Sequence, residues 1–171
     1  MPERDALASA NAAYAESFAA GDLPRPPARG LAVVTCMDAR LDPARICGLE
    51  PGDAHVIRNA GGLVTEDALR SLVISHWLLG TREVAVIAHT DCGMLTFAND
   101  DLRRKLAEEM GADASDVDFR PFRDLEASVR ESLRTVRDSR LLPDSLEVSG
   151  WIYDVHSGRL AGVSEPAGVR D

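Results

Sequence analysis

Two short clusters of side chains in this sequence could together bind a metal ion. The first cluster is Cys36-Met37-Asp38-Ala39-Arg40, and the second is His89-Thr90-Asp91-Cys92. Cys36, His89 and Cys92 offer two thiolates and one imidazole, a donor set that suits tetrahedral zinc. Three protein ligands leave a fourth coordination position open, which is the arrangement of a catalytic zinc site. The clusters therefore predict a bound Zn²⁺ that can act on a small molecule.

Asp38 has two possible roles beside such a metal, and Arg40 decides between them. The Asp38 carboxylate could accept a proton and orient a hydroxide on zinc, or it could itself ligate zinc and close the site. A bidentate pair between Arg40 and Asp38 would hold the carboxylate off the metal. We therefore predict metal ligation by Cys36, His89, Cys92 and, in a closed state, Asp38. Asp38 and Arg40 are the predicted catalytic residues.

Two apolar, β-branched runs must position these clusters. Leu31-Ala32-Val33-Val34-Thr35 precedes the first cluster, and Val84-Ala85-Val86-Ile87-Ala88 precedes the second. Such runs are typical of buried strands in a parallel sheet. Ligands bind beyond the carboxyl ends of such strands, so both clusters are expected at one edge of the sheet.

The remaining patterns predict an α/β fold in which strands and helices alternate. Further strands are expected at 54–57, 146–155 and 159–163, and helices at 4–20, 43–47, 66–79, 93–110 and 121–137. The central sheet should be mostly parallel with an antiparallel edge strand, and helices should flank it. We divide the chain into an N-terminal helical arm and proline linker (1–30), a zinc-binding α/β catalytic domain (31–165) and a frayed tail (166–171).

The N-terminal arm carries a narrow apolar stripe. Leu7, Ala10, Tyr14 and Phe18 recur at three- and four-residue steps. Three prolines between residues 24 and 27 make a stiff connection to the first strand. The stripe should therefore dock on a partner subunit, and the alternative is that it folds back on its own domain.

Composition excludes several classes of protein. The formal charge of −9 disfavours nucleic acid as a partner, and no apolar stretch approaches the roughly 20 residues of a membrane helix. The N-terminal residues lack the basic start and apolar core of a secretion signal. Three cysteines do not form a disulfide pattern, so we expect a reducing, cytoplasmic setting.

The Cys-x-Asp-x-Arg and His-x-x-Cys motifs, with Arg58-Asn59-Ala60-Gly61 between them, resemble the β-class carbonic anhydrases of the short bacterial type. Gly150-Trp151-Ile152-Tyr153-Asp154-Val155 is similar to the family's late edge hairpin. The resemblance covers residues 31 to about 163. It implies a zinc enzyme that interconverts carbon dioxide and bicarbonate plus a proton, using hydroxide on zinc.

The same resemblance implies four parallel strands with an added antiparallel edge strand. It also implies a homodimer or a higher oligomer, with the active site at the subunit interface and N-terminal helices embracing the neighbour. In the family, the aspartate–arginine pair switches between active and closed sites. Met94 departs from the pattern, because many members have a second glycine at that position.

Two alternative functions stay open on the sequence alone. Carbonyl sulfide and carbon disulfide hydrolases are similar to this family and share its zinc motifs. A non-catalytic zinc domain used for dimerisation or bicarbonate sensing is a second alternative. Cys47 is expected to be a packing residue inside a short helix, and Asp91 is expected to cap the following helix or to orient a ligand.

Overall fold

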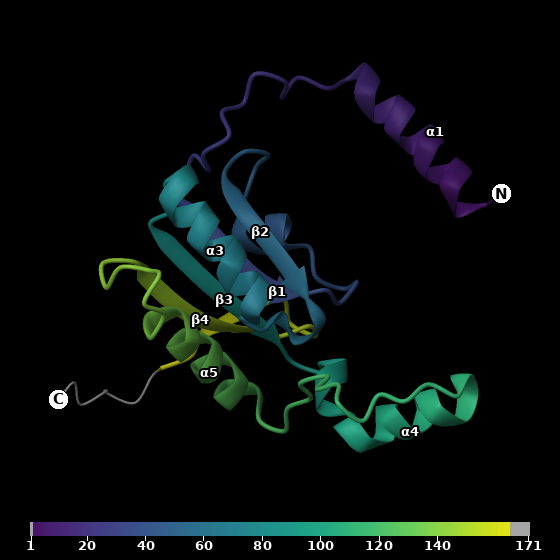
Figure 1. Cartoon of the computed structure of the whole chain (residues 1–171). Helices are drawn as coiled ribbons and strands as arrows, with labels where there is room; N and C mark the ends of the chain where they lie inside the picture. The colour runs from purple at the N-terminus through teal and green to yellow at the C-terminus, as the bar shows by residue number, and fades with distance from the viewer. Residues whose placement is uncertain (1, 165–171) are drawn as a thin grey trace.

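The computed structural model describes residues 2–164, which contain one five-stranded sheet with the order β2-β1-β3-β4-β5 (Figure 1). The strands are β1 (Leu31–Cys36), β2 (Ala54–Asn59), β3 (Glu83–His89), β4 (Glu147–Tyr153) and β5 (Leu160–Gly162). The first four strands are parallel, and β5 is antiparallel to β4. The predicted α/β fold with an antiparallel edge strand is therefore confirmed, with strand ends shifted by one or two residues.

The helices are α1 (Glu3–Glu16), α2 (Pro43–Cys47), α3 (Glu66–Leu79), α4 (Asn99–Met110) and α5 (Leu125–Arg137), with 3₁₀ turns η1 (Ala60–Gly62) and η2 (Gly93–Leu95). Both faces of the sheet are covered, and α1 and α4 bury none of their residues. On one face, Leu72 of α3 and Leu133 of α5 pack into the main core with Val34 and Val86. On the other face, Leu49 after α2 packs with a second core cluster. Burial on both faces explains the continuous apolar runs of β1 and β3.

The pairing of β1 with β3 sets the position of both chemical clusters. In this parallel pair Leu31 lies opposite Glu83 and Thr35 lies opposite Ile87. The buried Thr35 hydroxyl also donates a hydrogen bond of 2.8 Å to the Ile87 carbonyl, which ties the two strands near their carboxyl ends. Since β1 ends at Cys36 and β3 ends at His89, the two clusters emerge side by side at one edge of the sheet.

Two predicted helices begin later than the sequence pattern indicates. The segment predicted as one helix over 93–110 divides into η2 and α4, because the Asp101 carboxylate accepts a hydrogen bond from the Ala98 amide and starts a new helix there. The helix predicted from Pro121 begins at Leu125. Its N-cap is Asp124, whose side chain accepts from the Ala127 amide. In both cases an aspartate side chain that accepts from a backbone amide of the first turn, rather than apolar spacing, fixes where the helix begins.

Helix α1 lies apart from the sheet (Figure 1). It ends at Glu16 rather than near residue 20, has no buried residue, and leaves Leu7 and Tyr14 exposed. Phe18 falls beyond its end and packs against Tyr14 in a tilted arrangement, with ring centroids 5.6 Å apart. The structure therefore does not support the alternative in which the arm folds back on its own domain.

Across residues 2–164, every helix is too short or too polar to span a membrane. The tail predicted at 166–171 lies outside the described residues. The proposed boundaries of the three segments stay a prediction.

Candidate metal centre

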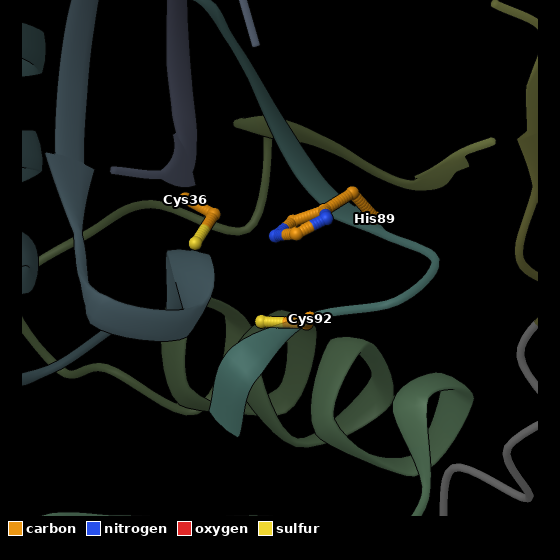
Figure 2. Close-up of side chains that lie close together, drawn as sticks. All are labelled: Cys36, His89 and Cys92. Carbon is orange, nitrogen blue, oxygen red and sulfur yellow. The ribbon is translucent and has the colours of Figure 1, made fainter. Parts of the chain in front are cut away.

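Cys36, His89 and Cys92 converge at the carboxyl edge of the sheet (Figure 2). Cys36 is the last residue of β1, His89 is the last residue of β3, and Cys92 follows the turn after β3. Their ligand atoms lie within 4.8 Å of one another, and all three side chains are buried. Two adjacent strand ends and one tight turn thus bring together residues that are distant in the sequence.

The His89 ring presents a free nitrogen to the two sulfurs. Its Nδ1 lies 2.8 Å from the Thr90 carbonyl, to which it can only donate, so in the neutral ring Nε2 is the unprotonated nitrogen. Within residues 2–164, His89 Nε2 is the one buried side-chain nitrogen or oxygen that lacks a hydrogen-bond partner. Such an orphaned atom is costly unless something binds it. A metal ion would satisfy it, so the residues present fit zinc.

The two thiols also fit a cation between them. A hydrogen bond from Cys92 lowers the pKa of Cys36, and the same contact together with burial raises the pKa of Cys92. One thiolate therefore forms readily, whereas a second thiolate beside it is opposed by the charge of the first. A divalent cation removes that opposition, because it stabilises both thiolates at once.

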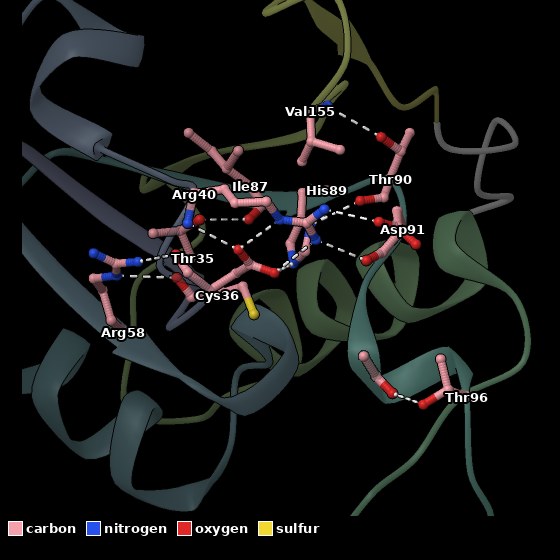
Figure 3. A network of polar contacts seen from close by, with 12 residues as sticks. Thr35, Cys36, Arg40, Arg58, Ile87, His89, Thr90, Asp91, Thr96 and Val155 are labelled. Carbon is pink, nitrogen blue, oxygen red and sulfur yellow. Dashed lines mark hydrogen bonds and ion pairs between the residues drawn. The ribbon is translucent and has the colours of Figure 1, made fainter.

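Arg40, which is labelled in Figure 3, forms a bidentate pair with Asp38 at the edge of this group. Arg40 Nε lies 3.0 Å from Asp38 Oδ1, and Arg40 Nη2 lies 2.8 Å from Oδ2. The Arg40 amide also donates to Oδ1 at 2.9 Å. These hydrogen bonds from Arg40 hold the pKa of Asp38 well below its usual range. Asp38 Oδ2 lies 3.7 Å from His89 Nε2, so a small movement would bring this carboxylate among the ligand atoms.

The end of β2 and the turn η1 that follows it pack against the backbone of the first cluster. Arg58 donates to the Cys36 carbonyl at 3.0 Å and to the Asp38 carbonyl at 2.7 Å. Gly62 has a φ of +65°, and a Cβ at this position would lie 2.8 Å from the Cys36 amide nitrogen. The loop can therefore approach β1 this closely only because residue 62 has no side chain.

Apolar side chains surround the buried thiols. Leu41 is buried with Cys36 and Cys92, and Met94 and Phe122 pack against the same cluster. The Phe122 amide donates to the Met94 carbonyl at 3.2 Å, which fixes the segment before α5 against η2. Sequence spacing wrongly assigns Phe122 to the buried face of a helix. The Asp124 cap is the signal that could have excluded it from that helix.

The structure separates the other candidate residues from the metal ligands. Cys47 is half-buried on α2 beside the second core cluster, where burial raises the pKa of its thiol. Asp91 does not cap η2, whose N-cap is Cys92 without a side-chain hydrogen bond. Its carboxylate instead accepts a hydrogen bond from Arg40 at 2.7 Å.

Comparison with known proteins agrees with this geometry. A family model described as carbonic anhydrase matches residues 31–160. β-Carbonic anhydrase 1 of Mycobacterium tuberculosis is 43% identical over 170 residues, which cover 96% of this chain and 99% of that protein. The crystal structure of a carbonic anhydrase from Streptococcus mutans has 47% identity and a TM-score of 0.92, and the match covers 96% of this chain and 99% of that one.

A carbon disulfide hydrolase of Saccharolobus solfataricus is also similar, with 31% identity over 159 residues. That match covers 79% of this chain and 78% of the hydrolase. The identity and both coverages are lower than those of the two carbonic anhydrases described above, so the comparison does not favour the hydrolase alternative. The resemblance predicted from the two motifs is confirmed, and the chain belongs to the β-carbonic anhydrase family.

Proposed function

We propose that this protein is a zinc enzyme that interconverts carbon dioxide and bicarbonate plus a proton. The observation that carries the proposal is the buried group of Cys36, His89 and Cys92, with an orphaned His89 Nε2 facing two sulfurs. The Asp38–Arg40 pair beside this group supplies a carboxylate within reach of the open coordination position. Membership of the β-carbonic anhydrase family supports the same activity.

Each residue of the site has a distinct role in this proposal. Cys36 Sγ, His89 Nε2 and Cys92 Sγ would hold the metal. The chemistry that zinc would supply there is a water molecule of lowered pKa, which is a nucleophile near neutral pH. Because two thiolates neutralise the formal charge of zinc, this site needs more help from its surroundings than an all-histidine site does.

Asp38 provides that help as a hydrogen-bond acceptor and orienting group. Its carboxylate stays ionised, because Arg40 holds its pKa low. The carboxylate can accept a hydrogen bond from the nucleophile and direct the oxygen lone pair toward carbon dioxide. If Asp38 instead becomes a metal ligand, no position remains for water. Arg40 favours the productive arrangement by holding Asp38 in a bidentate pair.

The apolar residues around the site suit the substrate. Carbon dioxide is apolar and offers little to hydrogen-bond, so it is held mainly by contact and by exclusion of water. Met94 and Phe122 lie against the thiol cluster and supply such a surface. Bicarbonate, which is charged, would be favoured less by this surface, and its release is thereby assisted.

A stopped-flow assay of carbon dioxide hydration on protein of known zinc content tests the proposal. We expect hydration to be lost when a chelator removes zinc and to return on reloading. Sulfide release from carbonyl sulfide and carbon disulfide should be measured on the same sample. Sulfide release with no hydration of carbon dioxide would refute the proposed substrate, and a zinc-loaded protein inactive in both assays would refute catalysis.

We further propose that the enzyme is a homodimer or a higher oligomer located in the cytoplasm. Support for assembly comes from α1, which buries none of its own residues and exposes Leu7 and Tyr14. Exposed Met37, next to Cys36, and exposed Val56, on β2, add further apolar surface. A cytoplasmic setting is supported by the free thiols of Cys36, Cys47 and Cys92, which need a reducing environment.

A further inference from the structure

Arg40 is shared between two carboxylates (Figure 3). Its Nε and Nη2 groups donate to Asp38, whereas its Nη1 donates to Asp91 Oδ2 at 2.7 Å. Arg40 Nη2 makes a further hydrogen bond of 2.9 Å to the Asp91 carbonyl oxygen. Different N–H groups serve the two acidic residues, so Asp91 does not displace Asp38 from the guanidinium. The two aspartates instead bind adjacent edges of the guanidinium, which share Nη2, and together fix its plane.

The backbone at Asp91 is arranged for this contact. Asp91 has a φ of +55°, a left-handed conformation that is unfavourable for most residues with a side chain. This conformation lets both the carbonyl and the carboxylate of Asp91 reach the same guanidinium. Asp91 also lies in the turn between His89 and Cys92, so its position is fixed relative to the metal ligands.

We propose that Asp91 is a positioning residue that acts through Arg40 and so keeps Asp38 out of the metal's ligand set. A single exposed ion pair is weak, because long side chains lose conformational freedom to make it. Arg40 is 46% exposed, so its pairing with Asp38 alone would be easily lost. The contacts with Asp91 hold the guanidinium in the orientation that binds Asp38. This inference rests on the roles proposed above for Asp38 and Arg40.

Two substitutions separate this role from a structural one. Asp91→Gly removes the carboxylate, and glycine adopts positive φ without penalty, so the turn should fold normally. Asp91→Asn keeps the size and one acceptor oxygen, and asparagine also tolerates this conformation. Asp67→Asn is a matched control, since Asp67 pairs with Arg70 on α3 outside the site. Metal content and thermal unfolding should be close to wild type in all three variants.

Thiocyanate binding to the cobalt-substituted enzyme measures the state of Asp38 directly. This anion can bind the metal only when Asp38 does not, and visible absorption of cobalt reports the binding. We expect Asp91→Gly to weaken thiocyanate binding by about fivefold and Asp91→Asn by about twofold, as for loss of an exposed ion pair. Asp67→Asn should have no effect. Removal of a nearby negative charge would by itself strengthen anion binding, so a weaker affinity points to Asp38 and not to simple charge.

The Arg40→Ala background shows whether Asp91 acts through Arg40. In that background Asp91→Gly should produce no further weakening, because the residue that it positions is already absent. Crystal structures of the metal-loaded Asp91→Gly variant should show Asp38 released from the Arg40 pair. Thiocyanate affinity equal to or higher than wild type in Asp91→Gly would overturn the inference, as would equal weakening with and without Arg40. If Arg40→Ala alone leaves thiocyanate affinity unchanged, the proposed role of the Asp38–Arg40 pair fails first.

Discussion

At the residue scale, hydrogen bonds to groups outside the ligand set prepare the candidate metal centre. The Thr90 carbonyl fixes the His89 tautomer, and the Arg58 guanidinium fixes the carbonyls of Cys36 and Asp38. Such supporting contacts orient metal ligands and raise affinity, because less freedom is lost on binding. The ligand atoms are therefore positioned before the metal arrives.

Substitution of any of the three ligands should remove zinc. We expect Cys36→Ala, His89→Ala and Cys92→Ala each to lower zinc content from about one ion per chain to near zero, since two protein ligands hold zinc poorly. Cys47→Ala is the control, because Cys47 lies on α2 away from the site. Zinc measured by atomic emission on purified protein checks this. Full zinc and full hydration activity in Cys92→Ala would show that the ligand assignment is wrong.

Substitution of Asp38 should separate catalysis from metal binding. Asp38→Asn removes the charged group that orients the nucleophile but not a required ligand, so it should keep zinc and lower kcat for hydration by about 10²-fold. Arg40→Lys should restore only part of the activity lost in Arg40→Ala, because an ammonium group cannot form the bidentate pair. Stopped-flow assays on metal-quantified variants measure both effects. An Asp38→Asn variant with wild-type kcat would exclude the proposed role.

The sequence predicts the residues of the centre better than their supporting contacts. Cys36, His89 and Cys92 can be found because each follows or ends an apolar run. The carboxyl ends of parallel strands lie at the same edge of a sheet, which brings these residues together. The pair of Arg40 with Asp91 cannot be found in this way, because no local period joins residues so distant in sequence. Phe122 is misplaced for a related reason, since its apolar spacing fits a helix that starts three residues later.

At the scale of elements, short polar caps and close backbone contacts decide where helices and loops lie. The patterns for α2 and α3 identify both ends, because Asp42, Gly48, Thr65 and Gly80 are strong cap residues. The patterns for α4 and α5 predict starts that are too early. In both, apolar residues N-terminal to the first helical turn continue the helical spacing. Periodicity therefore gives the existence and face of a helix, whereas the cap gives its first residue.

Two glycines with similar backbone angles provide a test of the loop behind the site. Gly62→Ala should destabilise the fold by at least about 2 kcal/mol more than Gly48→Ala, because the new Cβ would meet the β1 backbone. Gly48 also has a positive φ, of +58°, but a Cβ added there would have no heavy atom within 4 Å. Gly48→Ala should therefore lose only about 1 kcal/mol, from the left-handed conformation alone.

Chemical denaturation of both variants measures these losses, and zinc content of the folded fraction should fall only in Gly62→Ala. Equal destabilisation in the two variants would show that the close approach of η1 to Cys36 does not constrain the site.

At the scale of the whole molecule, the N-terminal arm is a helical segment whose apolar side chains are not covered by the rest of the chain. Its helix exposes apolar side chains on a chain segment that stands away from the sheet. Exposed apolar surface of this kind favours association with a second copy. The sequence identifies the stripe and the proline linker, because both are local patterns of residue type and spacing.

Deletion of residues 1–22 should weaken assembly and activity together. The truncated protein should retain its sheet and its zinc site, because neither includes a residue of the arm. We expect its dimer dissociation constant to rise by about tenfold or more, since burial of even two or three large apolar side chains contributes several kcal/mol. Sedimentation velocity over a concentration series measures this. An unchanged dimer with full activity would exclude the role given to the arm.

The junction of β1 and β3 at their carboxyl ends couples the stability of the folded chain to the supply of zinc. A metal held by Cys36 and His89 fastens neighbouring strands that no covalent bond joins. Since only the folded chain presents these ligands together, each tenfold rise in free zinc above the dissociation constant adds about 1.4 kcal/mol to the free energy of unfolding. Zinc supply should thus set the abundance of this enzyme as well as its rate. Under zinc starvation the apoprotein should be degraded faster than the loaded form, which pulse-chase measurement of its half-life would detect.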